Sequence, residues 1–140
     1  MAIIQTQCTV FKVNVLKGLE NFNTGTPYVY KIALYNANAN LNADTLVYTT
    51  DNEVTGAGYV AGGSVLIPAV PVSSSGTAYI SFDNVVWDPA NFTCRGALIY
   101  NSTTGAAIAT LNFGSDKTAI TTFTVTFPSP TASTAIIRLS

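Results

Sequence analysis

The amino-acid sequence predicts a mainly β protein, specifically a jelly-roll-like antiparallel β-sandwich of about eight strands. Apolar side chains recur mostly with a period of two, which is typical of strands that bury one face. Turn-forming clusters such as residues 73–76 separate these apolar runs. The 20 Thr, 12 Asn and 10 Ser also suit strands and turns rather than helices. A chain of 140 residues fits one sandwich domain over 1–140, with possible terminal arms at 1–9 and 128–140.

The N-terminal stretch is compatible with two local structures. Residues 11–15 alternate apolar and polar side chains like a strand, but apolar residues also recur at helical spacing between Phe11 and Phe22. We expect strand character first and then at most a short helical segment near residues 16–21.

The remaining strands follow from alternation and from the turn residues between them. We expect them at residues 28–35, 65–72, 77–83, 97–100, 107–113, 121–127 and 135–139. The two strands that flank residues 101–105 form a hairpin across that turn. Pro68 and Pro71 cannot donate to a ladder, so the strand that contains them is predicted to be broken or to lie at an edge.

Charge excludes several classes of function. Charged residues make up 9% of the chain, against roughly 25% in a typical soluble domain, and the formal net charge is -1. The few Lys and Arg are scattered, whereas nucleic-acid binding needs them clustered. No apolar run approaches the ~20 residues that span a bilayer. Because a net charge near zero favours association, we expect other subunits to cover part of this surface.

Five acidic residues are candidates for chemistry. Asp44, Asp51 and Glu53 could hold calcium, but their spacing fits no calcium loop, so solvated turn residues are the favoured interpretation. Asp83 and Asp88 could in principle hydrolyse a glycosidic bond, although two turn aspartates are far commoner. We therefore assign no metal site here.

No other pattern indicates an enzyme or a cofactor. The chain has no His, so His-based triads and most zinc sites are excluded, and no Ser-x-x-Lys spacing occurs. The glycine-rich residues 56–63 lack the Lys-Ser/Thr pair of a phosphate loop, which favours close backbone packing instead. We predict a non-enzymatic protein with no catalytic residues, no cofactor and no metal.

Two cysteines and the N-terminus bear on where the protein is made. Cys8 and Cys94 could form one disulfide, but buried thiols are the favoured interpretation. Residues 1–8 contain no basic region and no long apolar run, unlike a secretory signal. We expect synthesis in the cytosol.

Aromatic side chains allow a lectin-like alternative. Rings on an uncharged β surface could stack on sugars, whereas most rings in a sandwich fill the core. We place the Phe residues in the core, and leave Trp87 and Tyr59 open to either role.

The chain contains, in this order, the segments FKVNVLKGLENF (11–22), YKIALY (30–35), NEVTGAGYVAGG (52–63), RGALIYNS (95–102), FGSDKT (113–118) and AIIR (135–138). This ordered series resembles small virion structural proteins of tailed bacteriophages, and most of all their capsid cement (decoration) proteins. The chain departs from the family pattern at Glu20, where a His is expected before the Asn-Phe pair.

The resemblance implies a subunit on the outer surface of a capsid, made in the cytoplasm of the host bacterium. Its expected partners are the major capsid protein and further copies of itself, as a dimer or trimer, with no nucleic acid and no membrane. The alternative is a tail or tail-fibre accessory protein that contacts the host, or, from another class, an exported adhesive subunit with a Cys8–Cys94 disulfide. The candidate interface residues are Ile3, Ile4, Tyr59, Trp87, Ile136 and Ile137.

Overall fold

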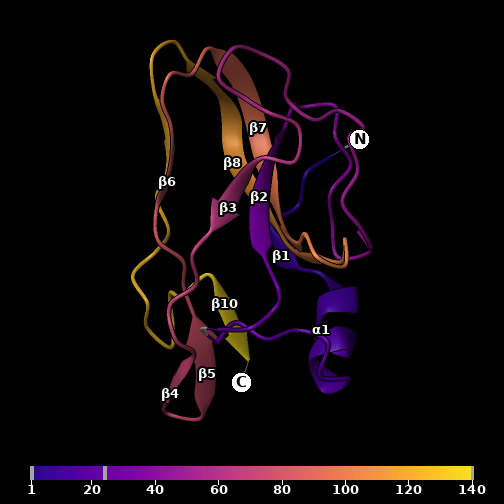
Figure 1. Ribbon diagram of the computed structural model, residues 1–140, viewed down its shortest axis with the longest axis vertical. Coiled ribbons are helices and arrows are strands. Elements are labelled where there is room, and N and C mark those ends of the chain that lie inside the picture. Colours follow the sequence, from indigo (N-terminus) through magenta and orange to yellow (C-terminus); the bar gives the residue numbers. More distant parts are fainter. Residues whose placement is uncertain (1, 24, 140) are drawn as a thin grey trace.

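Ten strands and one helix form the fold over residues 2–23 and 25–139, which are the residues that the computed structural model describes (Figure 1). The helix, α1, spans Thr9–Leu16. The strands are β1 (Thr6–Gln7), β2 (Tyr30–Tyr35), β3 (Ser64–Leu66), β4 (Val72–Ser74), β5 (Thr77–Ile80), β6 (Val85–Trp87), β7 (Phe92–Asn101), β8 (Ala107–Ala119), β9 (Phe123–Val125) and β10 (Ile137–Leu139). All pairings between these strands are antiparallel, so the predicted mainly β class is confirmed.

A five-stranded sheet in the order β1-β8-β7-β2-β3 forms the spine of the molecule. Strands β7 and β8 pair as the predicted hairpin, with Tyr100 opposite Ala107. Every residue of β2 except Lys31 is buried. This interior strand is therefore covered on both faces, which explains why its sequence is more apolar than simple alternation requires.

Two smaller sheets, β10-β5-β4 and β6-β9, complete the core. Aromatic rings join β6 and β9 to β7: Trp87 and Phe123 lie 6.5 Å and 5.7 Å from Phe92, measured between ring centroids. Phe82, which follows β5, lies 5.9 Å from Phe22 in the same way. Sheets joined by packed aromatic rings are compatible with a jelly-roll-like sandwich, and the jelly-roll topology itself stays a prediction.

Residues 65–72 are divided as the two prolines predict. Strand β3 ends at Leu66, β4 begins at Val72, and each lies at the end of its sheet. Pro68 and Pro71 fall between them, where a missing N–H breaks no ladder. The segment runs along the outside of the molecule from β3 down to β4 (Figure 1).

The expectation for the N-terminal stretch is wrong in two respects. Residues 11–15, which the alternation predicts as a strand, lie in helix α1. The segment near 16–21, which is predicted as helical, is not helical after Leu16. Gly18 adopts a positive φ of 73°, and the Leu19 N–H donates to the Asn14 carbonyl while the Gly18 N–H donates to the Val15 carbonyl. This glycine cap ends the helix and turns the chain back over β2.

The strands nearest the two termini pair with the body of the fold. Strand β1 pairs with β8, and β10 pairs with β5. Within the N-terminal segment, Ile3 is buried and forms a bridge with Leu41. The segments 1–9 and 128–140 therefore include strands that pair within this chain, and their end residues Met1 and Ser140 lie outside the described residues.

Candidate functional site

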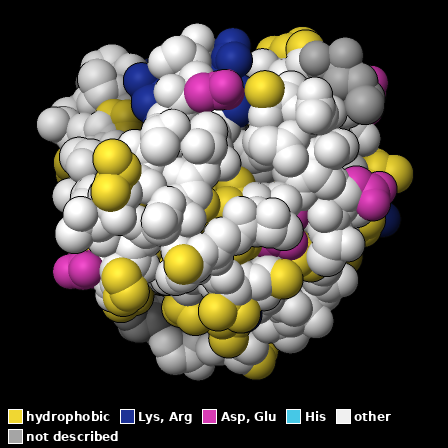
Figure 2. All heavy atoms as spheres, turned by 90° about the horizontal axis from the view of Figure 1, so that it is seen from above, with side chains coloured by type: hydrophobic (Ala, Val, Ile, Leu, Met, Phe, Trp, Pro, Cys, Tyr) yellow, Lys and Arg dark blue, Asp and Glu magenta, His cyan; other side chains and the backbone are white. Residues whose placement is uncertain are grey.

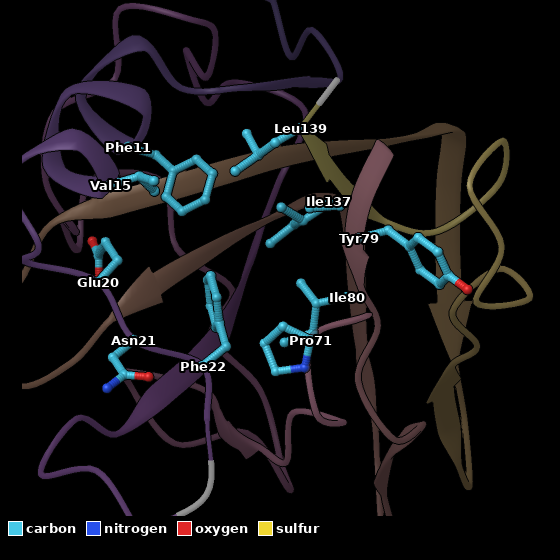
Figure 3. Close-up of a pocket in the computed structure, with 11 residues that line it drawn as sticks. Phe11, Val15, Glu20, Asn21, Phe22, Pro71, Tyr79, Ile80, Ile137 and Leu139 are labelled. Atoms are coloured by element: carbon cyan, nitrogen blue, oxygen red, sulfur yellow. The ribbon is translucent and has the colours of Figure 1, made fainter. Parts of the chain in front are cut away.

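An apolar pocket lies between α1, the turn that follows it, and the sheet β10-β5-β4. Its volume is about 220 Å³. It is lined by Phe11, Val15, Glu20, Asn21, Phe22, Pro71, Ala78, Tyr79, Ile80, Ile137 and Leu139. Figure 3 shows Glu20 and Asn21 at one end, Tyr79 at the other, and Phe11, Phe22 and Ile137 between them.

Local structure explains why apolar side chains converge here. Phe11 and Val15 are four residues apart on α1, so they lie on the same face of the helix. Ile137 pairs with Ile80 in the ladder between β10 and β5, and Leu139 pairs with Ala78. Residues paired in this way share one face of a sheet, so these side chains form a continuous apolar wall.

Glu20 is the acidic residue of the pocket, and its carboxylate is only half satisfied. Its Oε1 accepts hydrogen bonds from Asn101 Nδ2 at 2.8 Å and from the Tyr30 hydroxyl at 3.2 Å. Its Oε2 is shielded from water and accepts no hydrogen bond from any described residue. Burial raises the pKa of Glu20, and the hydrogen bonds from Asn101 and Tyr30 oppose that rise.

The glycine cap of α1 places Glu20 in this position. After Gly18 the chain returns to β2, where the Asn21 N–H donates to the Tyr30 hydroxyl at 2.8 Å. Phe22 packs on the same tyrosine, with 4.5 Å between the ring centroids. These two contacts fix the backbone on the C-terminal side of Glu20, and the carboxylate is held between α1 and β7.

No cation neutralises Glu20 within residues 2–23 and 25–139. The ion pair found there joins Arg95 to Asp116 at 3.6 Å, on β7 and β8. Apart from Glu20, Tyr79 is the one titratable side chain in the lining. The pocket thus combines apolar walls, one carboxylate and no positive partner, an arrangement suited to binding a hydrogen-bond donor or a cation.

Glu53, the second glutamate of the chain, is buried in a different way. Its Oε1 accepts a hydrogen bond from the Tyr48 hydroxyl at 2.6 Å. Its Oε2 accepts from the Tyr59 hydroxyl at 2.5 Å and from the Gly62 N–H at 2.8 Å. Both carboxylate oxygens are therefore satisfied by neutral donors, and the side chain is only 8% exposed.

Further tyrosines extend this Glu53 network. The Tyr59 hydroxyl also accepts the Leu34 N–H at 2.9 Å, and the Tyr100 hydroxyl donates to the Gly62 carbonyl at 2.7 Å. Burial is the main cause that raises the pKa of Tyr59, and it raises the pKa of Tyr100 to about 12 with help from the Glu53 charge. The network ties the glycine-rich residues 56–63 to the central sheet.

Close backbone packing explains the glycines of that loop. A side chain at Gly63, whose φ is 80°, would collide with the Ile32 carbonyl oxygen of β2. The glycine-rich segment therefore packs directly against the backbone of β2.

The other acidic candidates do not gather with Glu53. Asp44, Asp51, Asp83 and Asp88 are all exposed. Within the described residues, no group of three or more Asp, Glu, Cys or His side chains comes together in a way that could hold a metal ion.

The two cysteines are separate and buried. Cys8 and Cys94 are free thiols, and burial raises the pKa of Cys8 to about 11 and that of Cys94 to about 12. The interpretation of both as buried thiols is confirmed.

The six candidate interface residues fall into three groups. Ile3, Trp87 and Ile137 are buried in the core. Tyr59 and Ile136 are half-buried. Ile4 is exposed.

Trp87 and Tyr59 are both committed to internal contacts. Trp87 is 6% exposed and packs against Phe92 and Phe123, while the hydroxyl of Tyr59 is bound to Glu53. Trp87 is therefore too buried to stack on a sugar, and the half-buried Tyr59 is held through its hydroxyl.

The described surface exposes many large aliphatic side chains. Fifteen are exposed, against thirteen charged residues in the whole chain, over a total accessible area of 7114 Å². Four of them, Val65, Ile67, Val70 and Val72, lie in the apolar strip, our name for residues 65–72. Figure 2 shows one end of the molecule, where neutral atoms cover most of the surface and charged groups are few.

Neither the pocket nor the buried position of Glu20 is apparent from the sequence. The pocket is built from three stretches, 11–22, 71–80 and 137–139, that are distant from one another in the chain, so no local pattern reveals it. The sequence does single out the two glutamates in one respect. They are the only glutamates among the seven acidic residues, and each is followed by a segment rich in aromatic or glycine residues.

No protein-family model, curated protein or solved structure matches the chain. In the described part of the chain, the single helix is too short to cross a bilayer.

Proposed function

We propose that this chain is a non-enzymatic virion structural protein of a tailed bacteriophage, most like a capsid cement protein. It would bind the outer shell and strengthen contacts between subunits of the major capsid protein. The resemblance of its ordered segments to that family motivates the proposal. The observation that carries it is physical: exposed large aliphatic residues outnumber charged residues on a small β subunit.

Such a surface is suited to permanent contact with neighbours. Burying apolar area contributes about 25 cal/mol per Å², whereas burying an unpaired charge is costly. Neutral Thr, Asn and Ser around the aliphatic residues let two surfaces approach without desolvating ions. A subunit that binds only the assembled shell stabilises that shell by mass action.

The apolar strip is the surface that we assign to this contact. Its eight residues, VLIPAVPV, contain no charge, and it joins the outer strands of two sheets. Soluble β proteins usually protect such edges with lysine or proline. Here Pro68 and Pro71 limit strand pairing, while the exposed valines and Ile67 leave an apolar contact surface.

Copy number tests the location. Quantitative protein analysis of purified virions is expected to give hundreds of copies per particle, because a cement protein covers the shell. Six or twelve copies would contradict the capsid proposal and favour the tail alternative.

A pair of matched substitutions tests the surface. Ile67→Ser in the apolar strip is expected to weaken binding to isolated heads by about tenfold or more, because burial of such a side chain contributes about 1.5–3 kcal/mol. Ile120→Ser is the control, since Ile120 is 80% exposed but lies outside the strip. Equal binding by the two variants would refute the strip as the contact surface.

A further inference from the structure

We propose that the pocket beside α1 is a binding site for a primary ammonium group carried on a short aliphatic stem. The inference goes beyond the proposed function and does not depend on it. It rests on the shape of the pocket, on the half-satisfied carboxylate of Glu20 and on the aromatic rings beside that carboxylate.

The walls favour an aliphatic stem. Phe11, Val15, Ile80 and Ile137 contribute apolar side chains to a volume of about 220 Å³. For scale, an engineered apolar cavity of about 150 Å³ accommodates benzene. A stem of about five carbons therefore fits here with little polar surface to desolvate.

Glu20 supplies the polar requirement. Buried polar atoms in folded proteins nearly always have hydrogen-bond partners, yet Glu20 Oε2 has none among the described residues. The carboxylate also lacks a neighbouring cation, although burial of an unpaired charge is unfavourable. A cationic donor would supply both the missing hydrogen bond at Oε2 and the missing positive charge. At Glu53, by contrast, neutral donors of this chain already satisfy both carboxylate oxygens.

The hydrogen bonds already made by Glu20 select an ammonium over a guanidinium. Oε1 is occupied by Asn101 and Tyr30, so a two-pronged guanidinium would not find both oxygens free. An ammonium needs only Oε2. Oε2 is buried in the unliganded chain, so ammonium binding requires a turn of the carboxyl group about its broad terminal torsion, which also shifts Oε1 relative to its two donors.

The rings of Phe11 and Phe22 reinforce this choice. Their centroids lie 6.0 Å apart, and both residues line the pocket next to Glu20. The faces of aromatic rings attract cations, which favours an ammonium over a neutral hydroxyl on the same stem.

The test compares three ligands that share one stem. The purified chain is titrated at pH 7 with n-pentylammonium, 1-pentanol and pentanoate, and binding is followed by calorimetry. We expect n-pentylammonium to bind at least tenfold more tightly than 1-pentanol, and pentanoate to bind most weakly. Equal affinities for the amine and the alcohol would overturn the proposal.

Glu20→Gln separates the charge from the shape of the pocket. This variant is expected to lose the preference for the amine while keeping its affinity for 1-pentanol within about twofold. Asp83→Asn, which removes an exposed carboxylate outside the pocket, is expected to keep the preference. An amine preference that survives in Glu20→Gln would refute the role of Glu20.

A measurement on the unaltered chain covers the case in which Glu20→Gln does not fold. Methyl NMR during the amine titration is expected to shift the signals of Ile80 and Ile137 first, because both line the pocket. Shifts confined to methyl groups elsewhere would place the amine at another site and overturn the proposal.

The same chemistry can come from a free alkylamine or from a lysine side chain of a neighbouring protein. If n-pentylammonium binds the isolated chain and also displaces it from phage heads, a neighbouring lysine is the source. If it binds without displacement, the source is a free amine. A chain that binds the amine but has no affinity for heads or tails would contradict the proposed function and leave this site intact.

Discussion

The only two glutamates of the chain are both withdrawn from solvent, but their surroundings differ, whereas all five aspartates are exposed. Glu53 accepts three hydrogen bonds, from Tyr48, Tyr59 and Gly62, that satisfy both of its oxygens. Glu20 accepts two at one oxygen and none at the other.

This difference separates a structural carboxylate from a binding carboxylate. The Glu53 network closes on itself and fastens the glycine-rich loop to β2, so its contribution belongs to folding stability. Glu20 lines an apolar pocket, and its Oε2 accepts no hydrogen bond from a described residue, so we expect Glu20 to contribute to ligand binding. Substitution of Glu53 should therefore mainly lower the free energy of unfolding, whereas substitution of Glu20 should mainly change ligand binding.

The largest effect is expected from Glu53→Ala. This change leaves the Tyr48 and Tyr59 hydroxyls and the Gly62 N–H without their acceptor, and each such group costs about 1–3 kcal/mol when it is buried. We expect the free energy of unfolding in urea to fall by about 3 kcal/mol. Glu53→Gln, which keeps one acceptor oxygen, is expected to lose less, and a loss below about 1 kcal/mol in Glu53→Ala would contradict the structural role.

Tyr59→Phe should have an intermediate effect. It removes the donor to Glu53 and the acceptor of the Leu34 N–H, for an expected loss of about 1–2 kcal/mol in the same urea measurement. Tyr79→Phe is the matched control, because no described residue hydrogen-bonds to the Tyr79 hydroxyl. Equal losses in the two variants would show that the network contributes nothing.

Alkaline pH offers a second way to probe the network. Burial raises the pKa values of Tyr35, Tyr48, Tyr59 and Tyr100 above the ordinary value of 10.0, so the folded chain holds these protons more tightly than the unfolded chain. The free energy of unfolding should therefore be constant with respect to these groups below pH 10 and fall above it. Thermal unfolding from pH 8 to 11 should show this fall, and a smaller one in Tyr59→Phe; identical profiles would refute it.

The smallest effect on stability is expected at Glu20. Its pKa is raised above 4.5 by burial, so between 4.5 and its folded value the native chain binds more protons than the unfolded chain. Unfolding free energy should then decrease as pH rises through that window. Glu20→Gln removes this decrease, so the variant should gain stability relative to the unaltered chain from pH 4 to 7. A difference that stays constant with pH would contradict the burial of this charge.

Much of the sheet framework could be predicted from the sequence because the determining signals are local. Alternation identified β2, a turn-rich interval at residues 101–105 identified the β7–β8 hairpin, and two prolines identified the break between β3 and β4. In each case the deciding residues lie within a few positions of one another.

The helix and the two carboxylates could not be predicted in this way. The sequence TVFKVNVL of α1 is rich in β-branched residues, and its helical form is favoured by burial of Phe11 and the cap at Gly18. The surroundings of Glu20 include Asn101, which is 81 positions away in the chain. Only the tertiary fold brings these groups together, so local patterns carry no trace of the pocket.

Binding of the purified chain to phage heads that lack it shows whether its sparsely charged, aliphatic exterior packs against a shell. We expect the chain to bind in saturable amounts and to raise the temperature at which the heads break open. A chain that remains a single subunit at millimolar concentration, and leaves the heads unbound and no more heat-resistant, would refute a role in packing against the shell.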